Sequence, residues 1–205
     1  MKRFAFFCTV IALCALSGCS NGSGSNSSTP TLDEVFLTRR SIRAYEAGRT
    51  IPEAQLRELF EATQNAPSWA NYQPTKYYVA TSKEAHDAVL DLIGFNKERV
   101  ANASALIVST FENGKSGYLQ GQQTNEIGEG WGAHDNGLSD AYLVLKARAM
   151  GFDTLIMGMR DSDGLRNLFN IPDNETIMAV IALGYRAEEP RAPIHKSLDD
   201  FVKFF

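Results

Sequence analysis

The stretch with the clearest chemical potential is Arg39-Arg40-Ser41-Ile42-Arg43, which follows an expected helix end. Arg39, Ser41 and Arg43 occupy alternate positions, so an extended backbone would point their side chains the same way. Guanidinium groups offer planar pairs of donors and a serine hydroxyl adds a short neutral donor, which together suit a phosphate monoester. The alternative is a basic patch that only faces solvent. The stretch therefore predicts an anion site, provided that the surrounding elements support it.

The elements that must position this stretch alternate between helices and short apolar strands. Thr31-Leu32-Asp33-Glu34 fits a capping box for a short helix anchored by Val35 and Phe36, and Thr50-Ile51-Pro52-Glu53 fits a second capping box. Such a mixture predicts an α+β domain with helices on a sheet of about four or five strands. The sequence predicts a short helix from Thr31 to the arginine stretch and a second helix after the Thr50 capping box, with Leu56, Leu59, Phe60 and Thr63 at helical spacing. It also predicts helices at 83–95, within 131–150 and at 161–169, and strands at 76–80, 105–108, 153–157 and 176–183.

Two of these helices have a predicted buried face, defined by apolar residues at helical spacing. Between the strand at 105–108 and the helix at 131–150, residues 111–130 are rich in Gly and Gln and predict an excursion or lid. Asp135 could be a solvated acid or a helix cap as easily as a functional residue. The residues expected to be buried are Val89, Leu92 and Ile93 in the helix at 83–95, and Leu138, Ala141, Tyr142 and Leu145 in the helix at 131–150.

Residues 1–18 have the features of an export signal. Lys2-Arg3 precedes an apolar run from Phe4 to Leu16, which is too short to span a membrane comfortably. Leu16-Ser17-Gly18-Cys19 resembles a bacterial lipobox, in which the cysteine becomes the lipidated first residue; the alternative is an ordinary signal peptide cleaved nearby. Residues 19–30 then form a lipidated, flexible tether and residues 31–205 the folded domain. This organisation predicts an exported lipoprotein, anchored to a membrane of the cell envelope and facing the periplasm.

Charge and cysteine content exclude several classes of site. The chain has a net charge of -4 and a pI near 5.4, and removal of Lys2 and Arg3 leaves 18 basic against 24 acidic residues, a net charge of -6. Such an acidic chain is not expected to bind nucleic acid. Cleavage also removes Cys8 and Cys14, so cysteines cannot build a metal site, and the three histidines lack ligand spacing.

A combination of five segments is more specific than any of them alone. The segments are Arg39-Arg40-Ser41-Ile42-Arg43 before Ala44-Tyr45; Ala66-Pro67-Ser68 with Asn71, Gln73 and Pro74; Phe95-Asn96-Lys97-Glu98-Arg99; Ile156-Met157-Gly158; and Leu198-Asp199-Asp200-Phe201-Val202. In this order and spacing, the chain resembles the nitroreductase family of FMN-dependent flavoproteins over residues 31–205. The resemblance implies a nitroreductase-like α+β fold with a mostly antiparallel sheet of four or five strands flanked by helices.

The resemblance also implies a role for each arginine. Arg39, Arg40 and Ser41 would hold the phosphate and ribityl end of FMN. Arg43 and Arg99 would lie against the N1–C2=O edge of the flavin ring, where reduction develops negative charge. No acid–base triad is implied, because the flavin is the reagent and the protein supplies binding, orientation and charge.

Further contacts are implied around the ring and the phosphate. Asn96 would hydrogen-bond the pyrimidine side or the ribityl chain. The backbone N–H of Met157 or Gly158 would face N5 and O4. The tail would return a basic group, His195 or Lys196, to the phosphate.

The resemblance implies an intertwined homodimer as well. Pro67, Ser68 and Asn71 would enter the flavin site of the other subunit, so the site would exist only in the dimer. The implied activity is a ping-pong cycle in which NAD(P)H reduces the flavin and a nitroaromatic, quinone or similar small acceptor reoxidises it. Because NAD(P)H is cytoplasmic and a lipoprotein faces outward, two alternatives stay open. One is a membrane-tethered flavin-binding or electron-relay protein reduced by a protein or quinol partner, and the other is a flavin-free scaffold.

Overall fold

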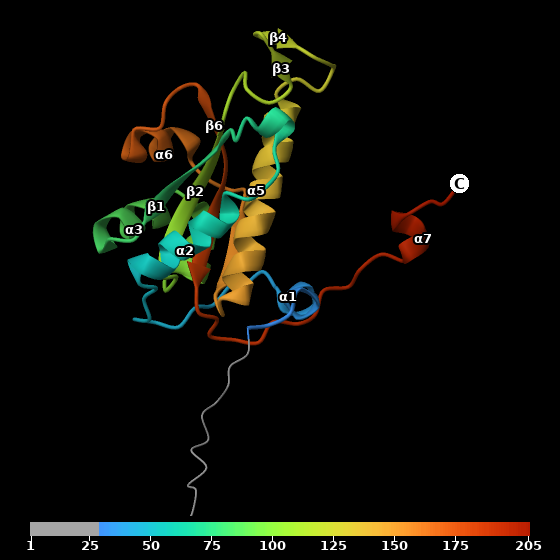
Figure 1. Cartoon of the computed structure of the whole chain (residues 1–205). Coiled ribbons are helices and arrows are strands. Elements are labelled where there is room, and N and C mark those ends of the chain that lie inside the picture. Colours follow the sequence, from blue (N-terminus) through green and yellow to red (C-terminus); the bar gives the residue numbers. More distant parts are fainter. Residues whose placement is uncertain (1–28) are drawn as a thin grey trace, which may run out of the picture.

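The computed structural model describes residues 29–205, which form three layers with a sheet in the middle (Figure 1). The predicted signal peptide, Cys19 and nearly all of the predicted tether lie outside the described residues. The sheet order is β1-β2-β6-β5 with every neighbouring pair antiparallel, and β3 pairs with β4 separately. The elements are α1 (Leu32–Thr38), α2 (Glu53–Thr63), η1 (Trp69–Asn71), β1 (Thr75–Ala80), α3 (Lys83–Leu90), η2 (Gly94–Asn96), α4 (Lys97–Val100), β2 (Ala105–Glu112), β3 (Tyr118–Leu119), β4 (Gln122–Gln123), α5 (Gly130–Ala149), β5 (Asp153–Met157), α6 (Ser162–Phe169), β6 (Glu175–Gly184) and α7 (Leu198–Phe201).

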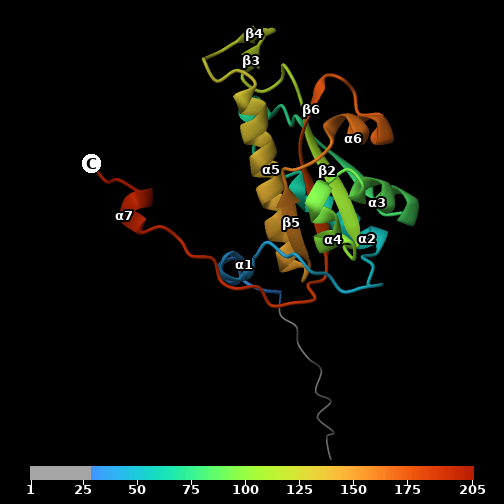
Figure 2. The same ribbon diagram turned by 180° about the vertical axis from the view of Figure 1, so that it is seen from behind.

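Each face of the sheet is covered by its own hydrophobic core, because side chains alternate along the strands. In β2, Ile107 packs with α2 and α5, whereas Leu106 and Val108 pack with α3, α4 and α6. In β6, Ile181 belongs to the core with α2 and α5, and Val180 belongs to the core with α3, α4 and α6. The view from behind shows α3, α4 and α6 gathered on the second face (Figure 2). The two central strands are therefore buried on both faces and apolar along most of their length.

The first helix begins as predicted. The Thr31 hydroxyl accepts from the Glu34 N–H at 3.3 Å, and the Glu34 carboxylate accepts from the Thr31 N–H at 2.7 Å, so the capping box is confirmed. Of the two expected anchors, Val35 is buried, but Phe36 is 54% exposed and is not part of the core of the described residues. Helix α1 therefore has more apolar residues than the described chain buries.

Two helix boundaries differ from the predictions. Helix α2 starts at Glu53, so its N-cap is Pro52, which has no side-chain acceptor; the second capping box is wrong. Helix α3 ends at Leu90 instead of reaching residue 95. Residues 91–93 form a turn, and Gly94, with a φ of 57°, then begins η2, so the helical path does not continue to residue 95.

The predicted buried face of α5 is wrong. Tyr142 is 42% exposed, Ala141 is exposed, and Leu138 and Leu145 are only partly buried. The residues of α5 that are buried are instead Gly132, Asp135, Asn136, Ser139, Asp140, Leu143, Val144 and Ala147.

Polar partners on the sheet explain why α5 turns a polar face inward. Asn136 Nδ2 donates to Ser109 Oγ at 2.9 Å and to the Thr110 carbonyl at 3.1 Å. Asp140 Oδ1 accepts from Ser109 Oγ at 2.8 Å and from the Tyr77 hydroxyl at 3.0 Å. Buried polar groups are tolerated when they are hydrogen-bonded, although burial still raises the pKa of Asp140. The apolar stripe of α5 is consequently left on the outside of the single chain.

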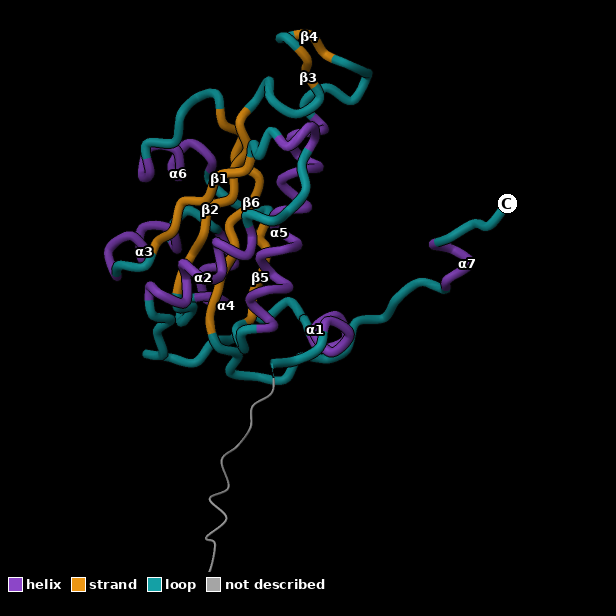
Figure 3. Tube along the Cα trace, in the orientation of Figure 1, coloured by secondary structure: helices purple, strands orange, loops and turns teal. Residues whose placement is uncertain are grey.

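Two segments expected to be irregular contain short elements. The 111–130 excursion begins as the end of β2 and then carries the β3–β4 pair above the N-terminal end of α5 (Figure 3). The C-terminal tail forms α7 and extends away from the three layers (Figure 1). Among the described residues, no helix is both long and apolar enough to cross a membrane.

Candidate functional site

The arginine stretch is extended, as its alternating pattern requires. Arg39 caps α1 with φ -63° and ψ 129°, and the chain then runs beside β5. Ser41 forms a parallel bridge with Thr154, and the Ile42 N–H donates to the Thr154 carbonyl at 3.0 Å. Ile42 is fully buried, whereas Ser41 and Arg43 on either side of it are exposed. The buried isoleucine thus anchors the stretch and leaves its polar neighbours facing outward.

The structure brings the predicted phosphate-binding side chains into one cavity of about 620 Å³. Within the described residues, neither Arg39 nor Arg43 forms an ion pair, so both guanidinium groups remain available for an anion. Glu189 of the same cavity is engaged by Arg186, at 2.9 Å. The cavity is lined by Arg39, Arg40, Ser41, Arg43, Glu188, Glu189, Pro190, Arg191 and Pro193.

Arg191 is a cavity residue that sequence reasoning missed. It lies in a tail without periodicity, and only the fold brings that tail beside the first arginines. His195 and Lys196, which were expected at the phosphate, do not line the cavity and are exposed further along the tail. Within one chain, Arg191 is therefore the tail's basic contribution, and a role for His195 or Lys196 stays a prediction.

A buried ion pair between Arg186 and Asp153 stabilises the segments that form this cavity. Arg186 donates through Nη2 to Asp153 Oδ1 at 2.6 Å and through Nε to Asp153 Oδ2 at 2.8 Å. Asp153 is 2% exposed, and its hydrogen bonds raise the pKa of Arg186, with a smaller contribution from Glu189. Arg186 also donates to the Thr38 carbonyl at 3.3 Å. The fork thus ties β5, the start of the tail and the end of α1 together next to the arginine stretch.

The exit of β5 lies on the same open edge of the sheet. Because the Thr154 carbonyl faces away from β6 to accept from Ile42, strand alternation directs the backbone groups of Met157 toward β6. Met157 is also 3% exposed, so neither its side chain nor its N–H is available. The Gly158 N–H points instead to the open edge and donates to no acceptor within the described chain. Of the two predicted residues, Gly158 therefore has the accessible backbone donor.

The Asn96 and Arg99 segment lies against this exit. The Asp161 N–H donates to the Leu92 carbonyl at 2.7 Å, and a Cβ added at Gly94 would lie 2.9 Å from the sulfur of Met159. Asn96 is buried, and its Oδ1 accepts from Arg99 Nη1 at 3.3 Å.

The Arg99 guanidinium lies 4.9 Å from the centre of the Phe95 ring, which is itself 61% exposed. Arg99 directly precedes Val100, and Arg43 directly follows Ile42. Val100 and Ile42 are buried residues of the same core cluster. Both arginines therefore flank the core on the same face of the sheet, and of the two only Arg43 lines the arginine cavity.

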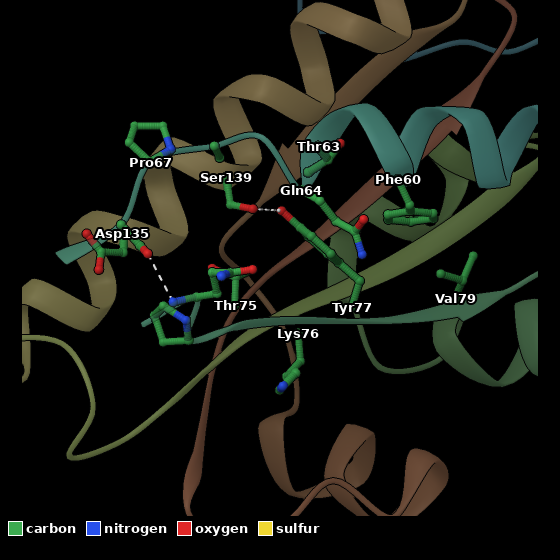
Figure 4. Close-up of a pocket in the computed structure, with 14 residues that line it drawn as sticks. Phe60, Thr63, Gln64, Pro67, Thr75, Lys76, Tyr77, Val79, Asp135 and Ser139 are labelled. Atoms are coloured by element: carbon green, nitrogen blue, oxygen red, sulfur yellow. Dashed lines mark hydrogen bonds between the residues drawn. The ribbon is translucent and has the colours of Figure 1, made fainter. Parts of the chain in front are cut away.

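Part of the Pro67–Asn71 loop lines a different cavity, of about 460 Å³, between α2, β1 and α5 (Figure 4), whereas Asn71 is exposed and is not among the lining residues. Pro67 and Ser68 line this cavity, and Ser68 Oγ accepts from the Gln73 N–H at 2.9 Å. Ala70, Asn71 and Gln73 all have positive φ values, between 48° and 58°. Such strain in non-glycine residues gathers at functional sites.

Asp135 fixes this loop to α5, which resolves its ambiguous prediction. Its Oδ2 accepts from the Trp69 N–H at 2.8 Å and from Ser116 Oγ at 2.6 Å, and the residue is 2% exposed. At the other end of α5, Arg148 Nε donates to Thr38 Oγ1 at 3.1 Å. Arg148 lies thirteen positions after Asp135, or roughly 20 Å along the helix axis. The loop and the arginine stretch therefore line separate cavities at opposite ends of α5.

A family model now adds to this geometry. The model described as "Nitroreductase family" matches residues 37–185. This chain belongs to the nitroreductase family. The prediction from the five segments is confirmed, and so is the nitroreductase-like α+β fold with its four-stranded antiparallel sheet.

Relatives of this nitroreductase-family chain agree with the assignment. A Bacillus subtilis protein with the provisional name NAD(P)H nitroreductase is 26% identical over 201 residues, covering 83% of this chain and 96% of the relative. An Exiguobacterium sibiricum protein solved in complex with FMN superposes with a TM-score of 0.78 at 21% identity, covering 87% and 99% of the two chains. An NADPH:FMN oxidoreductase from Vibrio harveyi, solved with NAD+, gives a TM-score of 0.71 at 21% identity, with 84% and 76% covered.

Alanine substitutions at two glycines of this nitroreductase-family chain are expected to differ in their effect on the free energy of unfolding. A Cβ at Gly158 would meet nothing within 4 Å, so Gly158→Ala should change the free energy of unfolding of the flavin-free protein by less than about 0.5 kcal/mol. A Cβ at Gly132 would approach Phe111 to 2.4 Å, so Gly132→Ala should cost about 1–3 kcal/mol. If a ligand lies close to the β5 exit, Gly158→Ala should weaken the binding of that ligand without lowering the free energy of unfolding. Gly132→Ala should lower the free energy of unfolding. Denaturant unfolding and FMN titration measure the two effects; an FMN affinity unchanged in Gly158→Ala would contradict a close approach.

Proposed function

We propose that this chain is an FMN-dependent oxidoreductase that accepts hydride from NADH or NADPH and passes electrons to a small acceptor in a ping-pong cycle. The acceptor class is a nitroaromatic, a quinone or a similar compound. The observation that carries the proposal is the arrangement along the β5 edge. There, a cavity with four arginines lies beside Thr154, and the unengaged Gly158 N–H lies four residues further along. The names of the relatives and the FMN held by structures of the same fold support it.

The side chains of this site bind and orient the cofactor. Arg39, Arg40 and Ser41 hold the phosphate, and Arg191 adds a fourth guanidinium at the same cavity. Arg43 and Arg99 place positive charge at the pyrimidine edge of the ring, and Asn96 adds a polar contact there. When bound, FMN itself supplies the hydride chemistry. No side chain is required as a general acid or base.

We propose that the active form is a homodimer, because several apolar surfaces lack a partner within the described chain. The outward stripe of α5 has exposed or partly buried apolar residues, and in α1 Leu32, Phe36 and Leu37 are 63%, 54% and 72% exposed. The strained Pro67–Asn71 loop lies far from the arginine cavity of its own chain. A second copy of the chain, related by twofold symmetry, would cover these surfaces and bring the loop to the partner's flavin.

The proposed function is tested by purifying residues 20–205 and recording the visible absorption spectrum. A flavin spectrum that bleaches anaerobically with NADPH or NADH, and recovers with a nitroaromatic or a quinone, is the expected result. A colourless protein that does not take up added FMN would refute the proposal. The single-turnover rates of bleaching and recovery would separate the two halves of the cycle.

A second candidate function is a membrane-tethered electron relay, which the predicted export signal favours. In that case the protein binds flavin, but only a protein or quinol donor reduces it. The same anaerobic screen decides between the two: reduction by a quinol analogue without reduction by NAD(P)H selects the relay.

The proposed membrane anchor depends on Cys19, which follows the lipobox-like Leu16-Ser17-Gly18. Stable anchoring needs more than one acyl chain, and lipoprotein maturation would supply them. Cys19→Ala is expected to move the protein out of the membrane fraction, whereas Ser20→Ala, one residue further along the tether, should not. Fractionation with immunoblotting and intact-mass measurement checks this. Wild-type protein without acyl groups would overturn the anchor but leave the proposed reaction untouched.

A further inference from the structure

Arg160 lies at the exit of β5, in a position that sequence reasoning did not single out. Its Nη1 donates to the Gly158 carbonyl at 2.6 Å, and its Nη2 donates to the carbonyl of Ile177 in β6. Its Nε is buried and has no hydrogen-bond partner. Both acceptors are neutral, and within residues 29–205 Arg160 forms no ion pair. Desolvation lowers the pKa of the Arg160 guanidinium. The positive charge of this side chain therefore lies partly buried without a carboxylate of the described residues beside it to neutralise it.

The hydrogen bond to Gly158 changes the direction of a peptide group. Along a regular strand, successive N–H groups point alternately to the two edges. Met157 pairs with Val180, so its carbonyl faces β6 and the trans peptide sends the Gly158 N–H to the open edge. The next N–H, that of Met159, should turn back toward β6. Because Arg160 holds the Gly158 carbonyl on the β6 side, the trans peptide sends the Met159 N–H to the open edge as well.

Two successive N–H groups therefore face the same side at the end of β5. Neither the Gly158 nor the Met159 N–H donates to an acceptor in the part of the chain that the structure describes. Consecutive N–H groups in such a turn form a small concavity that binds anions or electron-rich atoms. Two donors about one residue apart match two neighbouring acceptor atoms better than one isolated donor does.

We propose that Arg160 is a positioning residue of the flavin site, because it turns the Gly158–Met159 peptide so that two N–H groups face the open edge of β5. The pair binds two adjacent acceptor atoms on the flavin ring. This inference rests on the proposed function and deepens it. The unneutralised guanidinium behind the peptide also places positive charge near the ring, which favours the electron-rich reduced flavin over the oxidised one.

Arg166 provides a matched control for a merely structural role. It is likewise partly buried and clamps backbone carbonyls, donating through Nη1 to Ile171 at 3.1 Å and through Nη2 to Glu175 at 2.8 Å. Its contacts stabilise the connection from α6 to β6 and do not involve the β5 exit. Removing either arginine breaks an arginine–carbonyl clamp, but only one of the clamps orients the Gly158–Met159 peptide.

The experiment compares Arg160→Gln, Arg160→Lys and Arg166→Gln in residues 20–205, with and without FMN. Amide proton exchange by NMR is expected to show that FMN protects both the Gly158 and Met159 N–H groups in the wild type and in Arg166→Gln. In Arg160→Gln, FMN should protect Gly158 but not Met159. The dissociation constant of FMN should rise on the order of tenfold, and the flavin midpoint potential should fall. Arg166→Gln should lower thermal stability without either change.

Equal protection of both N–H groups in Arg160→Gln, or losses that match those in Arg166→Gln, would overturn the proposal. If Arg160→Gln does not fold, Arg160→Lys decides. Its one ammonium cannot reproduce the separate positions of Nη1 and Nη2 in the planar guanidinium, so protection of Met159 should weaken while protection of Gly158 persists. If the wild type binds no FMN, the proposed function fails by itself. The orientation of the peptide is then still tested by the Met159 amide chemical shift, which Arg160→Gln must change in the flavin-free protein and Arg166→Gln must not.

Discussion

Deleting residues 197–205 is expected to produce a monomer whose FMN affinity is lower by on the order of 100-fold or more. Four large apolar side chains of the deleted segment face solvent in the single chain, and burying each of them would contribute about 1.5–3 kcal/mol. A twofold-related copy would bury both tails, so their loss removes much of the association energy. These exposed residues are Leu198 (65%), Phe201 (82%), Phe204 (87%) and Phe205 (118%).

The design of this deletion separates the arm from the cavity. Arg191 and Pro193, which line the arginine cavity, remain in the shortened chain. Phe201→Ser should reproduce part of the effect, and Lys203→Gln, an exposed polar change on the same arm, should have none. Sedimentation velocity at several concentrations, read together with flavin absorbance, measures assembly and cofactor content. A shortened protein that stays dimeric and fully loaded with flavin would show that the tail has another role.

Single arginine substitutions are expected to change either the FMN affinity or the flavin midpoint potential, depending on which arginine is replaced. Arg39→Ala should weaken FMN binding on the order of 10- to 100-fold, because it removes a charge-assisted hydrogen bond to the phosphate. The flavin midpoint potential should barely change, since the phosphate keeps its charge when the ring is reduced. The cavity geometry supports this role, because Arg39 lines it and forms no ion pair within the described residues.

Arg43→Gln and Arg99→Gln should give the opposite pattern. Reduction develops negative charge on the ring, so a nearby guanidinium stabilises the reduced form more than the oxidised one. Loss of about 1–3 kcal/mol of that preference lowers a two-electron potential by roughly 20–60 mV. Spectroelectrochemical titration and FMN dissociation constants measure the two quantities. Arg57→Gln, on the exposed face of α2, is the control. If Arg39, Arg43 and Arg99 variants all lose affinity alike at an unmoved potential, the assignment of roles is wrong.

Much of the fold was predictable because local physics and tertiary structure agree. The four main strands, the capping box at Thr31 and the long helix after the excursion all follow from periodicity and capping. The extended conformation of the arginine stretch also follows, because alternation of polar residues around Ile42 suits an edge that is buried on one side. Family membership was predictable from five short segments in a set order.

The orientation of α5 could not be predicted from its own sequence. An apolar stripe indicates a face that something covers, but it does not say whether that partner is the same chain. Asp135, Asn136 and Asp140 can be buried only because Trp69, Ser116, Ser109, Thr110 and Tyr77 offer hydrogen bonds from distant segments. The result leaves the stripe of Leu138, Ala141, Tyr142 and Leu145 outward, where the proposed dimer would use it.

The sequence by itself determined the chemical inventory of this protein: the clustered arginines, the loop with its proline and asparagine, the glycine after β5 and the acidic balance. Only the tertiary structure decided which of these residues share a cavity. Arg191 joins the first arginines because the tail passes beside α1, and the Pro67–Asn71 loop is kept away from them by the length of α5. The direction of the Gly158–Met159 peptide depends on a single guanidinium and a carbonyl from another strand. Contacts between segments far apart in the chain leave no local periodicity, and for that physical reason they appear only in the folded molecule.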